Sequence, residues 1–273
     1  MGIRPGFEKD LQGMLSAEKW FLVFWIYSVC GWIWESVFYS FWTKHRFIDR
    51  GFLKGPYCPI YGCGAILNIS ILGRVSNPVL LLFLAGVMSC VLEYTTSYAT
   101  EKLFHARWWD YSDMPFNING RICLLGFLGF GAASVVLIKL IHPFLVQALN
   151  IIPLVWLHII TAVLLSGYLL DNIVTFSQAA KLDTQLREIS GQFARLKDQM
   201  ADYLETDRRT RMEHFFKQSL DSLSRSHKRL LHAFPRMQSL RYPYILQILK
   251  NSLNKRHESK SAEEDADQAS DIQ

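Results

Sequence analysis

Three carboxylic acids lie inside long apolar runs of this sequence: Glu35, Glu93 and Asp171. A charge at the centre of a bilayer costs on the order of 3 kcal/mol on insertion scales, so such residues usually face a cavity or a polar partner. We therefore interpret Glu35 and Glu93 as members of a functional site or of a polar network. Asp171 lies close to the end of its run, and we expect its side chain to turn toward the membrane surface.

Two loops between the apolar runs hold the other side chains that could bind a ligand. Residues 49–64 combine Gly and Pro, which favour a non-helical backbone, with Arg50, Tyr57 and Tyr61. Residues 108–121 crowd aromatic rings, amides and charged groups into 14 positions. This second loop is either an interfacial belt with turn residues or a binding loop folded over a cavity. Its candidate binding residues are Trp109, Asp110, Tyr111, Asn117, Asn119 and Arg121.

Several kinds of site are disfavoured by what the sequence lacks. The phosphate-binding pattern G-x-x-x-x-G-K-[ST] does not occur, so the chain carries no ATPase motif. Its five cysteines are odd in number and include no C-x-x-C pair, which argues against a disulfide framework and a zinc site. We therefore predict no metal and no cofactor, and an enzymatic function is the less favoured class.

Five apolar runs predict an all-α, polytopic integral membrane helix bundle. The first, residues 20–42, is about 34 Å long as a helix, enough to cross the hydrocarbon core. The second, residues 57–73, is short and has prolines at its start, so it either spans or begins as a re-entrant segment. The remaining runs are residues 78–99, 122–141 and 152–174.

Charge density separates this transmembrane part from the C-terminal part of the chain. Residues 20–177 contain 9 Lys/Arg and 7 Asp/Glu, whereas residues 178–273 contain 17 and 14. We predict an N-terminal tail (1–19), a transmembrane domain (20–177), a basic cytoplasmic helical extension (178–256) and a disordered acidic tail (257–273). The net charge of +5 favours anionic membrane lipids over nucleic acid as partners.

The distribution of Lys and Arg predicts the orientation in a bacterial cytoplasmic membrane. The loops after the first and third runs and the C-terminal extension are basic, so they are assigned to the cytoplasm and the N-terminus to the outside. With this orientation, Glu35, Glu93 and Asp171 fall in the cytoplasmic third of their helices. We therefore predict a polar cavity that opens to the cytoplasm, lined by these acids and closed by arginines of the loops.

The extension carries an apolar seam over residues 179–203 whose spacing alternates between three and four residues. Such a heptad pattern fits a helix that packs on a neighbour in the same chain, or a coiled coil that makes a homodimer. A second amphipathic stretch begins at Met212. This basic stretch either lies on anionic lipid or pairs with the first seam. Pairing would form a helical hairpin with a turn near residues 205–210, and a short helix is expected around residues 244–253.

Five stretches of the chain, taken in order, match the motifs of a known family. They are residues 31–35, 50–62, 92–94, 108–112 and 115–124. Through them the chain resembles, over about residues 20–145, the CmpB-like or type IV group of bacterial ABC-transporter permeases. It departs at Asp49, where the family has Asn, and at residues 130–131, where Phe-Gly replaces a usual Trp-Gly. The resemblance implies transport, and since this chain has no ATPase motif, the ATPase would be a separate subunit.

Three functions are open at this point. As a permease, the chain would use its acids to bind or couple to a cationic or polar solute of unknown identity. As a membrane-embedded enzyme acting on a lipid-linked substrate, it would use Glu35, Glu93 and Asp110 as acid/base groups, with Arg50 and Arg121 holding an anionic headgroup. As a scaffold or sensor, it would recruit partners through its coiled coil.

Overall fold

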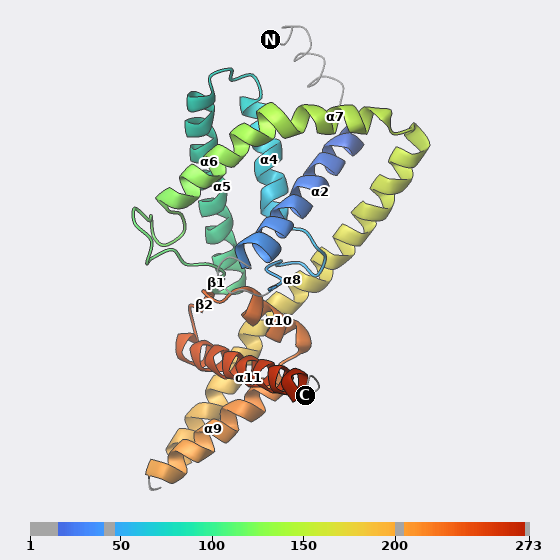
Figure 1. Cartoon of the computed structure of the whole chain (residues 1–273). Coiled ribbons are helices and arrows are strands. Elements are labelled where there is room, and N and C mark those ends of the chain that lie inside the picture. Colours follow the sequence, from blue (N-terminus) through green and yellow to red (C-terminus); the bar gives the residue numbers. More distant parts are fainter. Residues whose placement is uncertain (1–15, 41–46, 200–204, 271–273) are drawn as a thin grey trace. The chain divides into compact units, whose positions relative to one another are not determined.

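The structure is a computed structural model, and the residues that it describes are 16–40, 47–199 and 205–270. Most of these residues are helical (Figure 1), which confirms the predicted all-α membrane fold. The first 15 residues of the expected N-terminal tail lie outside the described residues, as do residues 41–46 at the end of the first apolar run.

Two compact units make up the chain, and each is described by itself. The bundle unit comprises residues 1–98 and 110–175, and the C-terminal unit comprises residues 99–109 and 176–273. The predicted acids belong to the bundle unit. Most of the predicted basic extension belongs to the C-terminal unit, together with the end of the third apolar run.

Four of the described helices are long and apolar enough to cross a bilayer. The second predicted run, residues 57–73, forms the shorter apolar helix α4 (Pro59–Leu72). This helix has 14 residues and extends about 21 Å, which is shorter than the ~30 Å hydrocarbon core. Pro59 occupies its first turn, where a missing N–H costs no helical hydrogen bond. The first of the four longer segments is α2 (Ala17–Ile33), continued by the π-helix η1 (Trp34–Tyr39), and the second is α5 (Pro78–Phe104). The third consists of α6 (Leu124–Val136), the π-helix η2 (Leu137–Ile141) and α7 (His142–Ile151) in succession. The fourth is α8 (Leu154–Gln199).

The helix α8 is a single helix of 46 residues, drawn without interruption in Figure 1. It joins the fifth apolar run to the seam of the extension, two segments that the sequence treats separately. Pro153 precedes the helix, and no proline occurs within it, so nothing breaks its backbone hydrogen bonds. Charged side chains therefore become frequent on α8 after residue 177, while its backbone remains helical.

Glycines bring the backbones of α2 and α4 close together. A Cβ at Gly62 would lie 2.3 Å from Ser28 Oγ and 2.4 Å from the Phe24 carbonyl oxygen. A Cβ at Gly31 would lie 2.2 Å from the Tyr61 ring. Small residues permit such approach between helices in lipid, where burial of apolar surface supplies little driving force. The contact between α2 and α4 therefore depends on the absence of side chains at these two positions.

The C-terminal unit is assembled on the part of α8 that lies after residue 175. Its other helices are α9 (Glu205–Ser222), α10 (Arg225–Ala233) and α11 (Pro243–Ser270). A short antiparallel pair of strands, β1 (Ala106–Arg107) and β2 (Gln238–Ser239), ties the segment after α5 to the segment between α10 and α11. Residues far apart in the sequence thereby share one small core.

Of the apolar seam predicted on residues 179–203, the positions up to residue 189 are buried in this unit and Phe193 and Leu196 are partly buried, while residues 200–203 lie outside the described residues. Leu182 and Leu186 are both 2 % exposed, and the ring centroids of Phe193 and Phe216 lie 5.2 Å apart. Because Phe216 belongs to α9, the seam packs on a helix of the same chain, which is one of the two interpretations of its heptad pattern. A homodimer is not needed to cover these residues.

Two expectations about the end of the chain differ from the structure. Residues 205–210, where a turn was expected, are helical and open α9. Residues 257–270, expected to be disordered, continue α11 to Ser270. This stretch contains three Ala and three Glu, residues with high helix propensity, which favours continuation of the helix.

The half-buried Lys250 of α11 makes the stability of the C-terminal unit depend on pH. Its ammonium donates to the carbonyl oxygens of Pro235 and Met237, and burial lowers its pKa from 10.5 to about 8. Between these two values the unfolded chain retains a proton that the folded chain has lost, so folding is favoured as pH rises. We expect the melting temperature of the full-length protein, relative to Lys250→Met, to increase from pH 8 to pH 10. An unchanged difference would contradict the lowered pKa.

Candidate functional site

Glu35 lies at the start of the π-helical segment η1, near the end of the first spanning helix. Its Oε1 accepts a hydrogen bond of 2.6 Å from the hydroxyl of Tyr61, which lies in the first turn of α4. Ser40 Oγ donates to the Glu35 carbonyl oxygen at 2.9 Å, which satisfies a backbone group that the wider π turn exposes. Single π turns within α-helices are frequent at functional sites. The carboxylate of Glu35 is therefore held at a fixed position by a neutral donor.

Glu93 is 5 % exposed and lies on α5. It accepts a hydrogen bond from the hydroxyl of Tyr111, and it interacts electrostatically with Glu35. Burial and the negative charge of Glu93 raise the pKa of Tyr111, which therefore stays a neutral donor. One carboxylate oxygen of Glu93, Oε2, is buried and has no hydrogen-bond partner among the described residues. We call Glu35, Tyr61, Glu93 and Tyr111 the carboxylate–tyrosine cluster.

The two arginines expected to close the acidic site contact other groups. Arg50 donates from Nε to Ser40 Oγ at 2.9 Å. Arg121 donates from Nη1 to Ser97 Oγ at 3.0 Å, and its guanidinium lies over the rings of Tyr94 and Tyr98. In the described part of the chain, no Lys or Arg forms an ion pair with Glu35 or Glu93. Tyrosines therefore occupy the positions beside the acids that the sequence assigned to arginines.

Asp171 anchors the first loop. Its two carboxylate oxygens accept from the backbone N–H of Lys54 at 3.1 Å and of Gly55 at 2.8 Å. They also accept from the Tyr57 hydroxyl at 2.7 Å and from the Thr175 hydroxyl at 2.9 Å. Burial and the nearby Asp171 raise the pKa of Tyr57, so the phenol stays protonated and donates. Tyr57 is thus part of a loop anchor.

Replacing Asp171 by Asn loosens this loop. Each oxygen of Asp171 accepts two hydrogen bonds, so the amide NH2 of the variant faces two donors in either orientation. We expect a loss of about 1–2 kcal/mol of loop stability, measured as faster hydrogen exchange of the Gly55 amide. Asn172→Ala is the control, because the Asn172 amide donates only to the Tyr168 carbonyl of its own helix. Equal exchange rates in the two variants would exclude this anchor.

A polar stripe on α2 and η1 also holds the first loop, and sequence reasoning missed it. Trp32 donates from its indole nitrogen to Asp49 Oδ1 at 2.8 Å. The backbone N–H of Arg50 donates to Ser36 Oγ at 3.0 Å. The sequence does contain a pattern that could have revealed this stripe: hydrogen-bonding side chains recur at every fourth position, which places them on one helical face. The stripe comprises Ser28, Trp32, Ser36 and Ser40.

The second loop is shaped by its own side chains. Asp110 Oδ1 accepts from the N–H and the hydroxyl of Ser112. Asn117 donates to the carbonyls of Ser112 and Met114 and accepts from the N–H of Gly120. These two predicted site residues therefore hold the loop conformation. Trp109 belongs to the C-terminal unit, outside the carboxylate–tyrosine cluster.

Asn119 has a left-handed backbone (φ 53°), and its amide donates to the Tyr94 hydroxyl at 3.0 Å. Such a conformation is uncommon outside glycine and is tolerated best by Asn and Asp. The sequence signal for it was the pair Asn119-Gly120, expected as a turn. The second loop therefore contains the expected turn at Asn119-Gly120, built with its own amides, and it also places Tyr111 beside Glu93.

The side chains of the cluster and of its surroundings differ in the charges that they carry. Burial, together with the charges of Glu35 and Asp49, raises the pKa of the Cys58 thiol to about 12, so this cysteine is not a thiolate at neutral pH. No group of three or more His, Cys, Asp or Glu suited to a metal ion occurs in the described residues. What the cluster offers is negative charge and neutral hydroxyl donors within an apolar bundle.

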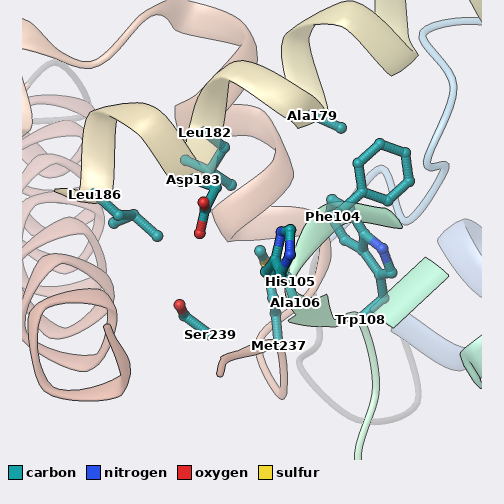
Figure 2. Close-up of a pocket in the computed structure, with 10 residues that line it drawn as sticks. All are labelled: Phe104, His105, Ala106, Trp108, Ala179, Leu182, Asp183, Leu186, Met237 and Ser239. Atoms are coloured by element: carbon teal, nitrogen blue, oxygen red, sulfur yellow. The ribbon is translucent and has the colours of Figure 1, made fainter. Parts of the chain in front are cut away.

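A hollow in the C-terminal unit is too small to serve as a ligand site. It has a volume of about 10 Å³, near the minimum for a single water molecule. Figure 2 shows the rings of Phe104 and Trp108 on one side of it and Leu182, Asp183 and Leu186 on another. It is a packing gap in the core that joins β1 and β2 to α8.

Comparison with known proteins assigns the chain to a family. The sequence profile of the family described as "Putative ABC-transporter type IV" matches residues 22–176, more than half of the chain. The chain belongs to this family. Together with its spanning helices, this membership makes it a transport-related membrane protein. The match extends beyond the expected residues 20–145 and includes Asp171. No curated protein and no solved structure matches the chain significantly.

The four members of the carboxylate–tyrosine cluster come from four of the stretches through which the chain resembles this family. Glu35 lies in residues 31–35, and Tyr61 lies in residues 50–62. The other two members, Glu93 and Tyr111, come from the stretches at residues 92–94 and 108–112. The fold thus brings separate motifs to one place inside the bundle unit.

Proposed function

We propose that this protein is a permease component whose carboxylate–tyrosine cluster binds one positive charge, carried either by the solute or by a proton coupled to its movement. The observation that carries the proposal is the buried Oε2 of Glu93, which has no hydrogen-bond partner among the described residues and lies within electrostatic range of Glu35. A carboxylate oxygen in this state attracts a cationic group or a proton.

Electrostatics gives the reason why two acids bind one charge. Two carboxylates that interact in apolar surroundings do not both ionise without a large cost, so they share one proton or one cation. The hydroxyls of Tyr61 and Tyr111 stabilise the negative charge that remains, and as neutral groups they do not cancel it. Binding and release of the single positive charge then switches the cluster between two states, as transport requires.

The proposal includes an orientation and partners. The cluster and the loops that carry Arg50 and Arg121 face the cytoplasm, where a polar cavity opens, and the N-terminus lies outside. The basic C-terminal unit contacts anionic lipid headgroups and docks a separate ATPase subunit, because this chain has no ATPase motif. A homodimer would use surfaces other than the buried seam residues Ala179, Leu182, Leu186 and Ile189.

A transport assay on the full-length protein tests this function. Cells that lack and cells that express the protein are compared for accumulation of, and resistance to, a panel of cationic, neutral and anionic solutes. We expect a difference for cationic solutes, which Glu35→Gln and Glu93→Gln each reduce about 10-fold or more. Glu18→Gln is the matched control, since Glu18 contacts His158 and lies at the other end of α2. If Glu35→Gln and Glu93→Gln both transport as the parent does, the cluster has no part in the function.

A further inference from the structure

A groove of about 450 Å³ lies between α5, the second loop and the start of α6. Its size is within the range of small-molecule binding sites, about 300–1,000 Å³. On α5 the lining residues recur at intervals of three and four, so they form one face of the helix. The groove is lined by Val87, Val91 and Tyr94 of α5, Phe116 and Ile118 of the loop, and Phe127 of α6, among others.

The apolar lining of the groove is suited to contact with lipid. Both α5 and the helix that begins with α6 are spanning segments, so a groove between them adjoins the hydrocarbon of the bilayer. An occupant must therefore present apolar groups to the groove, because a polar chain would leave its hydrogen bonds unmade there. The rim ends at Tyr94, whose hydroxyl accepts from Asn119, and this end is polar.

Small groups lie near Glu93 on the inner wall of the groove, together with the ring of Phe130, which is 3.9 Å from a Cβ placed at Gly126. Cys90 lines the groove three residues before Glu93, so the two are neighbours on the helix surface, and their side chains interact electrostatically. Cys123 lines the same wall. A Cβ placed at Gly126 would lie 3.7 Å from Glu93 Oε2 and 3.8 Å from Cys123 Sγ. The oxygen without a hydrogen-bond partner is thus flanked by a glycine and by thiols that line the groove.

The backbone of the second loop is strained where it borders the groove. Phe116 has φ 53° although it is not glycine, and its side chain is 81 % exposed. A left-handed backbone at such a residue costs free energy and persists where surrounding contacts impose it, often at ligand clamps. Here the strain presents an aromatic ring to the apolar groove.

From these observations we propose that the groove holds the apolar part of an amphipathic cation, whose positive head reaches Glu93 from the bilayer. This inference rests on the proposed function and specifies its substrate class: a long-chain amine or a comparable molecule with one charged end. The chain occupies the groove beside Val91 and Phe127. The head passes the small residues Cys90, Cys123 and Gly126 to reach Glu93 Oε2.

Photolabelling of the full-length protein in phosphatidylcholine nanodiscs tests the inference. The probe is dodecylamine with a diazirine in its chain, and the competitors are dodecylamine, dodecanol and butylamine. We expect saturable labelling within residues 87–95 and 116–127. Dodecylamine should compete at least about 10-fold better than dodecanol, which lacks the charge, or butylamine, which lacks the chain. Equal competition by dodecanol and dodecylamine would overturn the inference.

Three variants separate the parts of the site. Val91→Trp fills the groove and should remove labelling, whereas Val79→Trp should not, because Val79 lies on the same helix, is 75 % exposed and does not line the groove. Glu93→Gln should retain labelling and lose the preference for the amine. If Glu93→Gln abolishes transport but Val91→Trp does not, the solute enters from water, so this inference fails and the proposed function stands. If Glu35→Gln and Glu93→Gln both leave transport intact, the proposed function itself fails.

Discussion

Glu93→Gln is expected to lower the initial rate of transport about 10- to 100-fold, and Glu35→Gln is expected to lower it by a similar but slightly smaller factor. The amide retains a group that accepts a hydrogen bond from Tyr111 but removes the negative charge that binds the solute or the proton. Hydrogen bonds and ion contacts of a buried carboxylate contribute about 1.5–3 kcal/mol, which corresponds to this range of rates. The measurement is the initial rate for the solute identified in the panel, at equal protein abundance in the membrane.

The double variant distinguishes a shared charge from two separate sites. If the two acids bind one charge together, Glu35→Gln combined with Glu93→Gln is no slower than the slower single variant, because groups that act as a unit are not additive. Tyr61→Phe and Tyr111→Phe should each reduce the rate less, by about 3- to 10-fold, since each removes one neutral donor. Multiplicative effects of the two Gln substitutions would indicate independent sites.

Gly62→Ala is expected to destabilise the bundle unit by about 2–3 kcal/mol. The new Cβ would overlap Ser28 Oγ and the Phe24 carbonyl oxygen, and the latter is backbone that cannot rotate away. Overpacking of this kind typically costs about 1–3 kcal/mol, and lipid cannot offset it with hydrophobic burial. The measurement is thermal unfolding of the purified full-length protein in detergent, with a decrease in melting temperature expected.

A matched substitution controls for the general effect of adding a methyl group. Gly167→Ala on α8 places a Cβ with nothing within 4 Å, so its melting temperature should remain that of the parent. Gly31→Ala pushes on the Tyr61 ring and should therefore reduce both stability and transport. Equal melting temperatures for Gly62→Ala and Gly167→Ala would show that α2 and α4 do not meet as described.

The apolar runs predicted the helices of the bundle because hydrophobicity over about 20 residues is a strong local signal. The acids were also recognisable, because Glu35 and Glu93 interrupt such runs. The groups that bind these acids could not be recognised from the sequence, because a tyrosine hydroxyl and an arginine guanidinium can both donate to a carboxylate. The choice between them depends on where Tyr61 and Tyr111 are placed by the fold, and no local pattern encodes that placement.

The ends of helices were harder to predict where the amino-acid composition changes but the helical backbone continues. The change in charge after residue 177 lies within two residues of the boundary between the two units, yet α8 continues across this boundary to Gln199 because no helix-breaking residue occurs there. The role of Asp171 was missed for a related reason. Its acceptors are filled by the backbone of Lys54 and Gly55, more than 100 residues earlier, and contacts of that range leave no periodic signal in the sequence.

Infrared difference spectroscopy of the full-length protein in nanodiscs tests the shared charge most directly. A protonated carboxyl group absorbs infrared light at a different frequency from an ionised carboxylate. A protonated carboxyl group can therefore be detected at neutral pH even when the solute is unknown. The account predicts one such band without solute, lost in both Glu35→Gln and Glu93→Gln, retained in Glu18→Gln, and diminished when dodecylamine is added. A spectrum that neither cluster substitution changes would contradict the account, because Glu35 and Glu93 would then not share one positive charge.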